Sequence, residues 1–323
     1  MSRPRLVCLI GPTASGKSAL GLALAERLGA EIVSADSRQV YRGLDVGTAK
    51  PTAAEQARVP HHAIDVAEPD EPFDAARFRA LATDAIGAAQ ARGRPVLVVG
   101  GTGLWVRVLL RGLCPAPPAA PALRGVLRAW AAREGGPALH RRLAFVDPAA
   151  AARIHPRDAV RIVRALEVAL ASGRRLSAWQ AAHGFGDAPW DALLVGLALP
   201  ASTLDARIAA RARQMLAAGF LEEVEALVAR GLPPAAPAWK TVGYPEMRAC
   251  VEGRCDAEAA LAAAVLATRR FARRQRTWFR TEPGVCWRHP EEDAARVAAE
   301  VEAFVATGAR PDHARVAKPG GAG

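Results

Sequence analysis

A glycine-rich loop near the N-terminus constrains this chain more than any other feature. Residues 11–18 read GPTASGKS and fit the pattern G-x-x-x-x-G-K-[S/T], directly after an apolar run and directly before a helical pattern. In that setting backbone N–H groups surround an oxyanion, and the helix start adds partial positive charge. The loop predicts a diphosphate or triphosphate site, with Ser18 as a Mg²⁺ ligand, formed by Gly11, Pro12, Thr13, Ala14, Ser15, Gly16, Lys17 and Ser18.

The segments around this loop alternate between strand-like and helical patterns. Apolar runs at 5–10, 31–35 and 95–99 have the composition of buried strands, and residues 17–28 and 73–92 are helical in pattern. Strands that alternate with helices are typical of βαβ units and a parallel sheet. We therefore expect an α/β fold with a P-loop nucleotide-fold core built on a parallel sheet.

A proline-rich segment interrupts this alternation. Residues 114–121 read CPAPPAAP, which can continue neither a helix nor a central strand, and residues 123–182 are helical in pattern. A strand at 192–199 and helices at 204–229 and 257–279 follow. The tail is rich in Pro, Gly and Ala, a composition that buries little surface. The domains expected are a catalytic core at 1–119 and 188–308, an inserted helical domain at 120–187, and a flexible tail at 309–323.

The charge balance indicates an anionic partner. The 323 residues contain 43 Lys and Arg against 32 Asp and Glu, which gives a net charge of +11 and a pI of about 10.4. This balance suits nucleic acid, an acidic lipid surface or phosphorylated small molecules.

No apolar run reaches about 18 residues and no signal-peptide pattern is present, so we expect a cytoplasmic protein without a membrane partner. Five scattered cysteines without a Cys-x-x-Cys pair predict reduced thiols.

One carboxylate stands at the expected end of the second strand. Residues 31–35 deliver Asp36 to the carboxyl edge of the sheet, beside the phosphate loop, where ligands bind in open α/β folds. A carboxylate is poorly suited to bind a diphosphate. It is better suited to accept a proton from a nucleophile or to hold a metal through water. The structural alternative for Asp36 is a surface aspartate that begins a turn.

Further motifs follow in order along the chain. They are DSRQVY-x-GLDVGTAKP at 36–51, HH-x-ID at 61–65, GGTGL at 100–104, RIVRALE at 161–167, TVGY at 241–244, and an arginine-rich run at 268–278. Together with GPTASGKS they closely resemble the bacterial tRNA dimethylallyltransferases, over roughly residues 6–288. The block at 36–51 is long enough to be specific, whereas the phosphate loop alone occurs in many families.

This resemblance implies an activity and its participants. The family transfers a dimethylallyl group from dimethylallyl diphosphate to N6 of the adenosine on the 3′ side of certain tRNA anticodons, using Mg²⁺. The expected partners are dimethylallyl diphosphate and the anticodon stem-loop of tRNA, and we expect a monomer. By resemblance, residues 13–18 hold the diphosphate and Asp36 accepts the N6 proton. Lys17, Thr102 and Arg211 assist positioning and charge stabilisation around the diphosphate.

The resemblance also implies a set of tRNA contacts. These are Asp36, Ser37, Arg38, Gln39, Thr102, Val160, Arg161, Arg164, Lys240, Thr241, Val242, Gly243, Tyr244, Arg273, Arg274, Gln275, Thr277, Trp278 and Arg280. Three positions depart from the family pattern. Val160 stands where Gln is common, Pro245 where a basic residue is common, and Trp105 replaces Tyr. A base or sugar interaction made by that Gln would be missing here.

Arginines recur at helical spacing near the C-terminal end of the core. Arg269, Arg273, Arg276 and Arg280 fall on one stripe of the predicted helix, beside a stripe formed by Phe271, Gln275 and Trp278. Guanidinium groups suit RNA phosphates, and planar side chains can stack on unpaired bases. We expect phosphate contacts from the arginines, whereas the aromatic residues are expected to reach the core.

A second arginine-rich segment lies in the expected insertion. Pro156 is expected to open a helix, on which Arg157, Arg161 and Arg164 share one face while apolar residues supply the packed side. This helix is expected to form a second RNA contact.

Three other functions fit parts of this pattern. A P-loop kinase of a small metabolite shares the phosphate loop, and an adenylate isopentenyltransferase acts on free nucleotide. A nucleotide-gated RNA-binding protein would need no chemistry. Free nucleotides do not require a helical insertion or arginine stripes, which favours tRNA as the acceptor.

Overall fold

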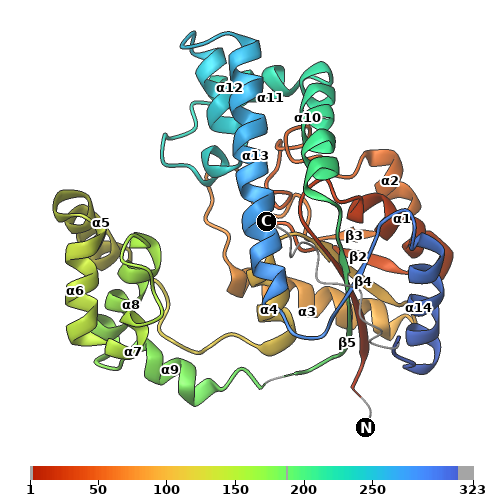
Figure 1. Cartoon of the computed structure of the whole chain (residues 1–323), viewed down its shortest axis with the longest axis horizontal. Coiled ribbons are helices and arrows are strands. Elements are labelled where there is room, and N and C mark those ends of the chain that lie inside the picture. Colours follow the sequence, from red (N-terminus) through yellow and green to blue (C-terminus); the bar gives the residue numbers. More distant parts are fainter. Residues whose placement is uncertain (1–2, 187, 312–323) are drawn as a thin grey trace. The chain divides into compact units, whose positions relative to one another are not determined.

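The computed structural model describes residues 3–186 and 188–311, and its core is one parallel sheet (Figure 1). Its neighbouring strands are all parallel, in the order β3-β2-β4-β1-β5-β6. The strands within the described ranges are β1 (Arg5–Ile10), β2 (Glu31–Ser34), β3 (His61–His62), β4 (Val96–Gly100), β5 (Asp191–Leu197) and β6 (Val285–Arg288). The expected α/β class and parallel sheet are confirmed, while β3 and β6 were not expected.

Successive residues of β1 are buried on opposite faces of the sheet. Leu6, Cys8 and Ile10 pack with helix α3 (Ala75–Ala91). Val7 and Leu9 pack with α1 (Lys17–Leu28) and α14 (Ala294–Thr307), which lie side by side on their face of the sheet (Figure 1). Because helices cover both faces, every position from 6 to 10 must be apolar.

Several helices surround the carboxyl end of this sheet. Gly219, with φ +96°, separates α10 (Ala201–Ala217) from α11 (Phe220–Ala229), so two helices stand where a single helix was expected at 204–229. Asp256 caps α13 by accepting a hydrogen bond from the Ala259 amide (2.7 Å). The helices are α2 (Ala53–Arg58), α4 (Gly103–Arg111), α10 (Ala201–Ala217), α11 (Phe220–Ala229), α12 (Tyr244–Val251) and α13 (Ala257–Arg280), with a 3-10 turn at Pro237–Lys240.

The chain divides into two compact units. Unit 1 comprises residues 1–110 and 189–323, and unit 2 comprises residues 111–188. In its described part, unit 2 contains helices α5 (Pro121–Glu134), α6 (Gly136–Val146), α7 (Pro148–Ala151), α8 (Ala159–Ser172) and α9 (Leu176–His183). Its boundary lies at 111, earlier than the expected 120. The proline-rich segment belongs to unit 2 because Arg164 donates to the Pro117 carbonyl (2.6 Å) and the Ala120 amide donates to Glu167 (2.9 Å).

The expectation that Pro156 opens a helix is wrong. Helix α8 begins at Ala159, and Asp158 caps it by accepting a hydrogen bond from the Arg161 amide (3.1 Å). Arg157 therefore precedes the helix and does not share a helical face with Arg161.

The beginning of the expected tail is bound to the sheet. Arg310 donates to the Ala192 carbonyl (3.0 Å) and pairs with Asp191, both in β5. Residues 312–323, which make up most of the tail expected to be flexible, lie outside the described residues.

All five cysteines are free thiols, as expected. Within the described ranges, no helix is both long and apolar enough to cross a membrane.

Candidate active site

A cavity of about 200 Å³ opens beside the phosphate loop in unit 1. It brings together segments that are far apart in the sequence: the phosphate loop, the turn after β2, α10, the segment before α12, and α13. Its lining includes polar Thr13, Asp36, Ser37, Arg38, Thr48, Arg211, Lys240, Thr241 and Arg274, and also Ala14, Gly47, Ile208, Met215, Phe220, Val242, Gly243, Met247 and Phe271. Asp36 and residues 240–243 belong to separate motifs and Arg211 was implied by the resemblance, and all of them line one cavity.

The phosphate loop has the setting that its sequence predicts. It follows β1, and Gly16 directly precedes α1 in a left-handed conformation with φ +87°. The Ser15 amide and Lys17 Nζ both donate to the Pro12 carbonyl, at 3.3 and 3.2 Å. These bonds fix the shape of the loop, so its remaining amides are preorganised for an oxyanion.

Three cations lie around Asp36: Lys17 is buried, and Arg38 and Arg211 are half-buried. Burial lowers the pKa of Lys17 to about 8, with Asp36 opposing the shift and Arg211 adding a smaller contribution to it. Burial also lowers the pKa values of Arg38 and Arg211, and Asp36 again opposes the change. One carboxylate cannot balance three cations in a low-dielectric site. The excess positive charge favours an anionic ligand here.

A short turn places Asp36 at the carboxyl end of β2. The Arg38 amide donates to Asp36 Oδ1 (2.9 Å), and the Ser37 amide donates to Thr102 Oγ1 (3.0 Å). The Thr102 amide in turn donates to the Ala35 carbonyl (3.1 Å). Thr102 therefore positions Asp36 through the backbone of the turn. A hydroxyl oxygen that accepts the Ser37 amide keeps its own hydrogen for a ligand.

Gln275 supports the phosphate loop from α13. Its side chain is buried, its Oε1 accepts a hydrogen bond from the Thr13 amide (2.8 Å), and its Nε2 donates to the Gly101 carbonyl (3.0 Å). The side chain thus joins α13 to the loops that follow β1 and β4. Both polar atoms of this side chain are thus engaged inside the protein, and the tRNA contact expected of Gln275 stays a prediction.

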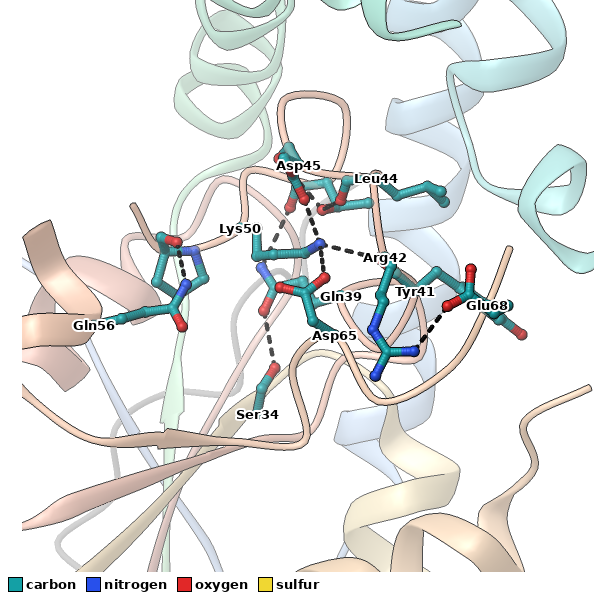
Figure 2. A network of polar contacts seen from close by, with 12 residues as sticks. Ser34, Gln39, Tyr41, Arg42, Leu44, Asp45, Lys50, Gln56, Asp65 and Glu68 are labelled. Atoms are coloured by element: carbon teal, nitrogen blue, oxygen red, sulfur yellow. Dashed lines mark hydrogen bonds and ion pairs between the residues drawn. The ribbon is translucent and has the colours of Figure 1, made fainter. Parts of the chain in front are cut away.

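A polar network holds the chain between Tyr41 and Lys50, which contributes to one wall of the cavity (Figure 2). The Lys50 side chain is 3% exposed, and its Nζ donates to the Tyr41 carbonyl (2.9 Å) and pairs with Asp45 and Asp65. A buried ammonium without its carboxylate partners would be strongly destabilising. Much of the long block at 36–51 is therefore needed for folding.

Gln39 also holds this wall. Its Oε1 accepts a hydrogen bond from Ser34 Oγ (2.8 Å), and its Nε2 donates to the Thr48 and Ala49 carbonyls (3.3 and 3.1 Å; Figure 2). Gln39 is 8% exposed, and the tRNA contact expected of this residue stays a prediction.

Glu223 of α11 is a site residue that the sequence analysis missed. Its carboxylate accepts hydrogen bonds from the amides of Asp45 (2.7 Å), Val46 (2.6 Å) and Gly47 (3.1 Å), and from Tyr244 Oη (2.6 Å). Burial raises the pKa of Tyr244, which therefore donates as the neutral phenol. Tyr244 is fully buried, and the tRNA contact expected of this residue stays a prediction.

The arginine stripe of α13 exists as predicted. Arg269, Arg273 and Arg280 are exposed and Arg276 is half-buried. Burial lowers the pKa of Arg276, the neighbouring Arg280 and Arg273 lower it further, and Asp205, which also pairs with Arg269 (3.7 Å), opposes them. Like charges at such spacing repel one another, and one carboxylate beside several arginines leaves an excess of positive charge that favours a further anion.

Other residues of α13 divide between surface and interior. Arg274 and Thr277 are exposed, and Arg274 also lines the cavity. Trp278 packs inward beneath the Arg107 guanidinium, which lies 4.5 Å from its ring centroid. A Cβ on Gly103 would lie 2.1 Å from the same ring, so glycine is required there. Trp278 thus contributes to packing, as expected for the aromatic residues of this helix.

Unit 2 presents only part of its expected RNA face. Val160 is 78% exposed and Arg161 is exposed. Arg164 instead donates to the fully buried Glu167 (2.8 Å), which also binds Arg124 (2.6 Å). Arg164 is therefore used to hold α8 against the start of the unit.

Ser18 is exposed in the first turn of α1. Among the residues that the structure describes, no group of three His, Cys, Asp or Glu side chains is arranged to hold a metal ion. Mg²⁺ usually keeps several waters and takes one or two protein ligands together with substrate phosphates. A single hydroxyl beside a diphosphate site fits that donor set.

The parallel sheet, the phosphate loop and the shared cavity define a P-loop protein whose anion site adjoins a carboxylate and a basic helix. The family model described as IPP transferase matches residues 39–282, and the model described as isopentenyl transferase matches residues 4–65. The chain belongs to the IPP transferase family, which confirms the resemblance seen in its motifs.

Named relatives cover nearly the whole chain. A protein called tRNA dimethylallyltransferase from Anaeromyxobacter dehalogenans is 56% identical over 298 residues, which is 92% of this chain and 99% of the relative. One of the same name from Myxococcus xanthus is 49% identical over 293 residues, 91% of this chain and 95% of the relative. The crystal structure of a tRNA isopentenylpyrophosphate transferase from Bacillus halodurans superposes with a TM-score of 0.70 at 35% identity, covering 94% and 97% of the two chains.

A more distant structure shares the fold. It belongs to a eukaryotic dimethylallyltransferase acting on tRNA, with a TM-score of 0.79 at 23% identity, and covers 95% of this chain and 80% of that one.

Proposed function

We propose that this protein transfers a dimethylallyl group from dimethylallyl diphosphate to N6 of the adenosine on the 3′ side of the anticodon in tRNA. The observation that carries this proposal is the position of Asp36, which lines the same cavity as Thr13 of the phosphate loop and Arg211. A proton acceptor and an anion site at one cavity suit the alkylation of an amine by a diphosphate ester.

The chain's own residues account for each change in bonding. The N6 amine attacks C1 of the dimethylallyl group while the bond from C1 to the diphosphate oxygen breaks. Asp36 accepts the proton that N6 releases, and the departing diphosphate takes up the electron pair of the broken bond. Lys17, Arg211 and the loop amides stabilise that negative charge. Ser18 would hold Mg²⁺ together with the diphosphate, where the metal supplies additional charge neutralisation.

Placement of the basic residues supports tRNA as the acceptor. Arg274 lines the cavity, and the arginine stripe lies on the same helix. An adenosine in a stacked loop must be extruded before it can enter a cavity, at a cost of a few kcal/mol. Contacts between the arginines and the RNA backbone would offset that cost. Arg38, Ser37, Lys240, Thr241, Val242 and Gly243, all at the cavity, would contact the extruded nucleotide and its neighbours.

The assembly and location follow from this reaction. We propose a monomer, since one chain supplies the loop, the carboxylate and the arginine that line the cavity. We propose a cytoplasmic location because that is where unmodified tRNA is found. Light scattering of the purified protein tests the first point.

The decisive experiment compares acceptors and donors. The protein is incubated with dimethylallyl diphosphate, Mg²⁺ and unmodified tRNA, and the digested nucleosides are analysed by mass spectrometry. We expect dimethylallyl adenosine from tRNA, with no product from AMP or ADP and no consumption of ATP. Product from free AMP with none from tRNA would overturn the acceptor assignment, and phosphorylation of a metabolite by ATP would favour the kinase alternative.

A further inference from the structure

Helix α10 carries a second arginine on the face that meets the phosphate loop. Leu204 and Ile208 of this helix are buried in a cluster that includes Ala14 of the loop. Arg211, three residues after Ile208, lines the cavity. Arg207 lies one helical turn before Arg211, and residues four apart share one face of a helix. The side chain of Arg207 thus starts from the same surface as that of Arg211.

The end of this side chain lies close to the loop backbone. A Cβ built on Gly16 would lie 3.8 Å from Arg207 Nη1. Gly16 immediately precedes Lys17 and Ser18, whose amides open α1. A guanidinium here stands at the helix start where an oxyanion is favoured.

In this structure Arg207 is paired with Glu291, in the segment between β6 and α14. The two side chains are 30% and 68% exposed. Exposed ion pairs of this kind contribute little to stability. A diphosphate, which carries more charge than one carboxylate and lies between preorganised amides, would displace Glu291 from the guanidinium.

We propose that Arg207 binds the diphosphate together with the phosphate loop, and that Glu291 competes with the diphosphate for this guanidinium. The inference rests on the proposed function, because it assumes that the loop holds the leaving group. Arg207 and Arg211 would then contact the diphosphate from one helix, with Lys17 on the opposite side of the ligand. Guanidinium groups donate in a planar fork that suits phosphate oxygens.

The test uses inorganic pyrophosphate as the probe and isothermal titration calorimetry of the full chain with Mg²⁺. Arg207→Gln is expected to weaken pyrophosphate binding by about tenfold or more, the usual effect of removing a charge-assisted hydrogen bond. Glu291→Gln is expected to tighten binding by about two- to fivefold, because it removes the competitor. In the double variant, Glu291→Gln is expected to add nothing to the effect of Arg207→Gln. Arg213→Gln, on an exposed position of the same helix, is the matched control and should leave the affinity unchanged.

The opposite signs separate binding from a structural role. If the Arg207 and Glu291 pair only holds the fold, both single variants lower the melting temperature and neither tightens pyrophosphate binding, which overturns the inference. Unchanged binding in Arg207→Gln overturns it as well. Lys17→Ala is measured in parallel. If Lys17→Ala and Arg207→Gln both bind pyrophosphate normally, the assignment of the phosphate loop as the diphosphate site is contradicted. If Lys17→Ala weakens binding and Arg207→Gln does not, the proposed function stands and the role proposed for Arg207 is contradicted.

Discussion

At the scale of single residues, Asp36 and Lys17 lie in one electrostatic environment but are proposed to act on different substrates: Asp36 on the amine of the acceptor and Lys17 on the diphosphate of the donor. Asp36 raises the pKa of Lys17, whereas burial and Arg211 lower it to about 8. A carboxylate that lines the cavity can accept a proton, and an anionic diphosphate stabilises the protonated form of a lysine whose pKa burial has lowered. Replacement of Asp36 should therefore affect the chemical step, whereas replacement of Lys17 should affect use of the diphosphate donor.

Asp36→Asn is expected to slow the chemical step without weakening substrate binding. The amide oxygen can still accept the Arg38 hydrogen bond (2.9 Å in the native turn), so the turn persists, while N6 loses its proton acceptor. Loss of a general base typically costs roughly 10²–10⁴ in rate. Single-turnover kinetics should show this loss, and filter binding should show native tRNA affinity. A near-native rate would rule Asp36 out as the base.

The pH dependence of donor use should report the ionisation of Lys17. Lys17 is protonated below about pH 8 and neutral above it in the free protein. An anionic diphosphate binds the protonated form more tightly, so its binding raises the pKa of Lys17. We expect kcat/KM for dimethylallyl diphosphate to fall as pH rises through about 8, and we expect Lys17→Ala to lack this fall. The same fall in Lys17→Ala would assign it to another group.

The sequence was informative about ligand-binding motifs and much less so about the side chains that support them. The phosphate loop and Asp36 were located because strand ends and glycine-rich turns have a local pattern. The resemblance implied a tRNA contact for Gln275, whereas the partners of its side chain, Thr13 and Gly101, are remote in sequence and could not be predicted. Glu223 looks like its neighbours Glu222 and Glu225 in the sequence, and only tertiary structure shows which one meets buried amides.

At the scale of elements, α11 holds the cavity wall through the Glu223 carboxylate and the Phe220 ring, and Tyr244 of α12 donates a hydrogen bond to that carboxylate. Glu223 accepts three consecutive amides of residues 45–47. A Cβ on Gly47 would lie 2.1 Å from the Phe220 ring, so the wall packs directly on α11. Both features place Gly47 and Thr48 at the cavity.

Glu223→Gln is expected to lower both stability and activity. The amide can accept through one oxygen only, and its NH₂ group faces backbone donors, so we expect a loss of about 1.5–3 kcal/mol of unfolding free energy. Urea denaturation measures that loss, and the KM for tRNA should rise because the wall at 47–48 is loosened. Glu225→Gln, an exposed residue on the same helix, is the control and should behave like the native protein. Native stability in Glu223→Gln would contradict the role assigned to this carboxylate.

Helix α13 has a buried side that supports the loop and an exposed side that carries arginines. Ala272, Gln275 and Phe279 are buried, while Arg273 and Arg280 are exposed. A helix with this division can bind an anion on one side without disturbing the packing of the other.

Replacement of Arg269, Arg273 and Arg276 with Gln is expected to raise the KM for tRNA and to flatten its salt dependence. For each phosphate that is no longer neutralised by an arginine, the slope of log K against log salt should fall by roughly 0.7–0.9. Pyrophosphate affinity should stay close to native, since none of the three lines the cavity. Binding assays over a series of salt concentrations measure the slope. An unchanged slope would mean that the stripe is a solvated surface and that RNA binds elsewhere.

At the scale of the whole molecule, the core was more predictable than the insertion. Strand β1 and helix α1 have the expected bounds, because a strand buried on both faces is a continuous apolar run and a glycine begins and ends the helix. Strands β3 and β6 are two and four residues long, too short for a periodic pattern. Most of the proline-rich segment was assigned to the core at 1–119, but its carbonyl and amide groups bind Arg164 and Glu167, which a composition argument does not detect.

Unit 2 has its own core and a strongly basic composition. Leu127, Leu139, Leu143, Ile162 and Leu166 form a buried cluster confined to this unit. Residues 111–188 contain twelve arginines, no lysine and five acidic residues. A unit that is separately packed and strongly basic fits a role in binding RNA, whereas the phosphate loop and the residues that line the cavity belong to unit 1.

Leu143→Ala should therefore separate the two binding activities. Leu143 is fully buried, and truncation of such a leucine typically costs about 2–5 kcal/mol. Because its neighbours all belong to unit 2, we expect faster hydrogen exchange in α5, α6 and α8, weaker tRNA binding, and native pyrophosphate affinity. Leu24→Ala, in α1 of unit 1, is the reciprocal control and should speed exchange around the phosphate loop while α6 and α8 keep native rates. If Leu143→Ala speeds exchange in β1 and α1 as much as in unit 2, the units unfold together and their binding activities do not separate.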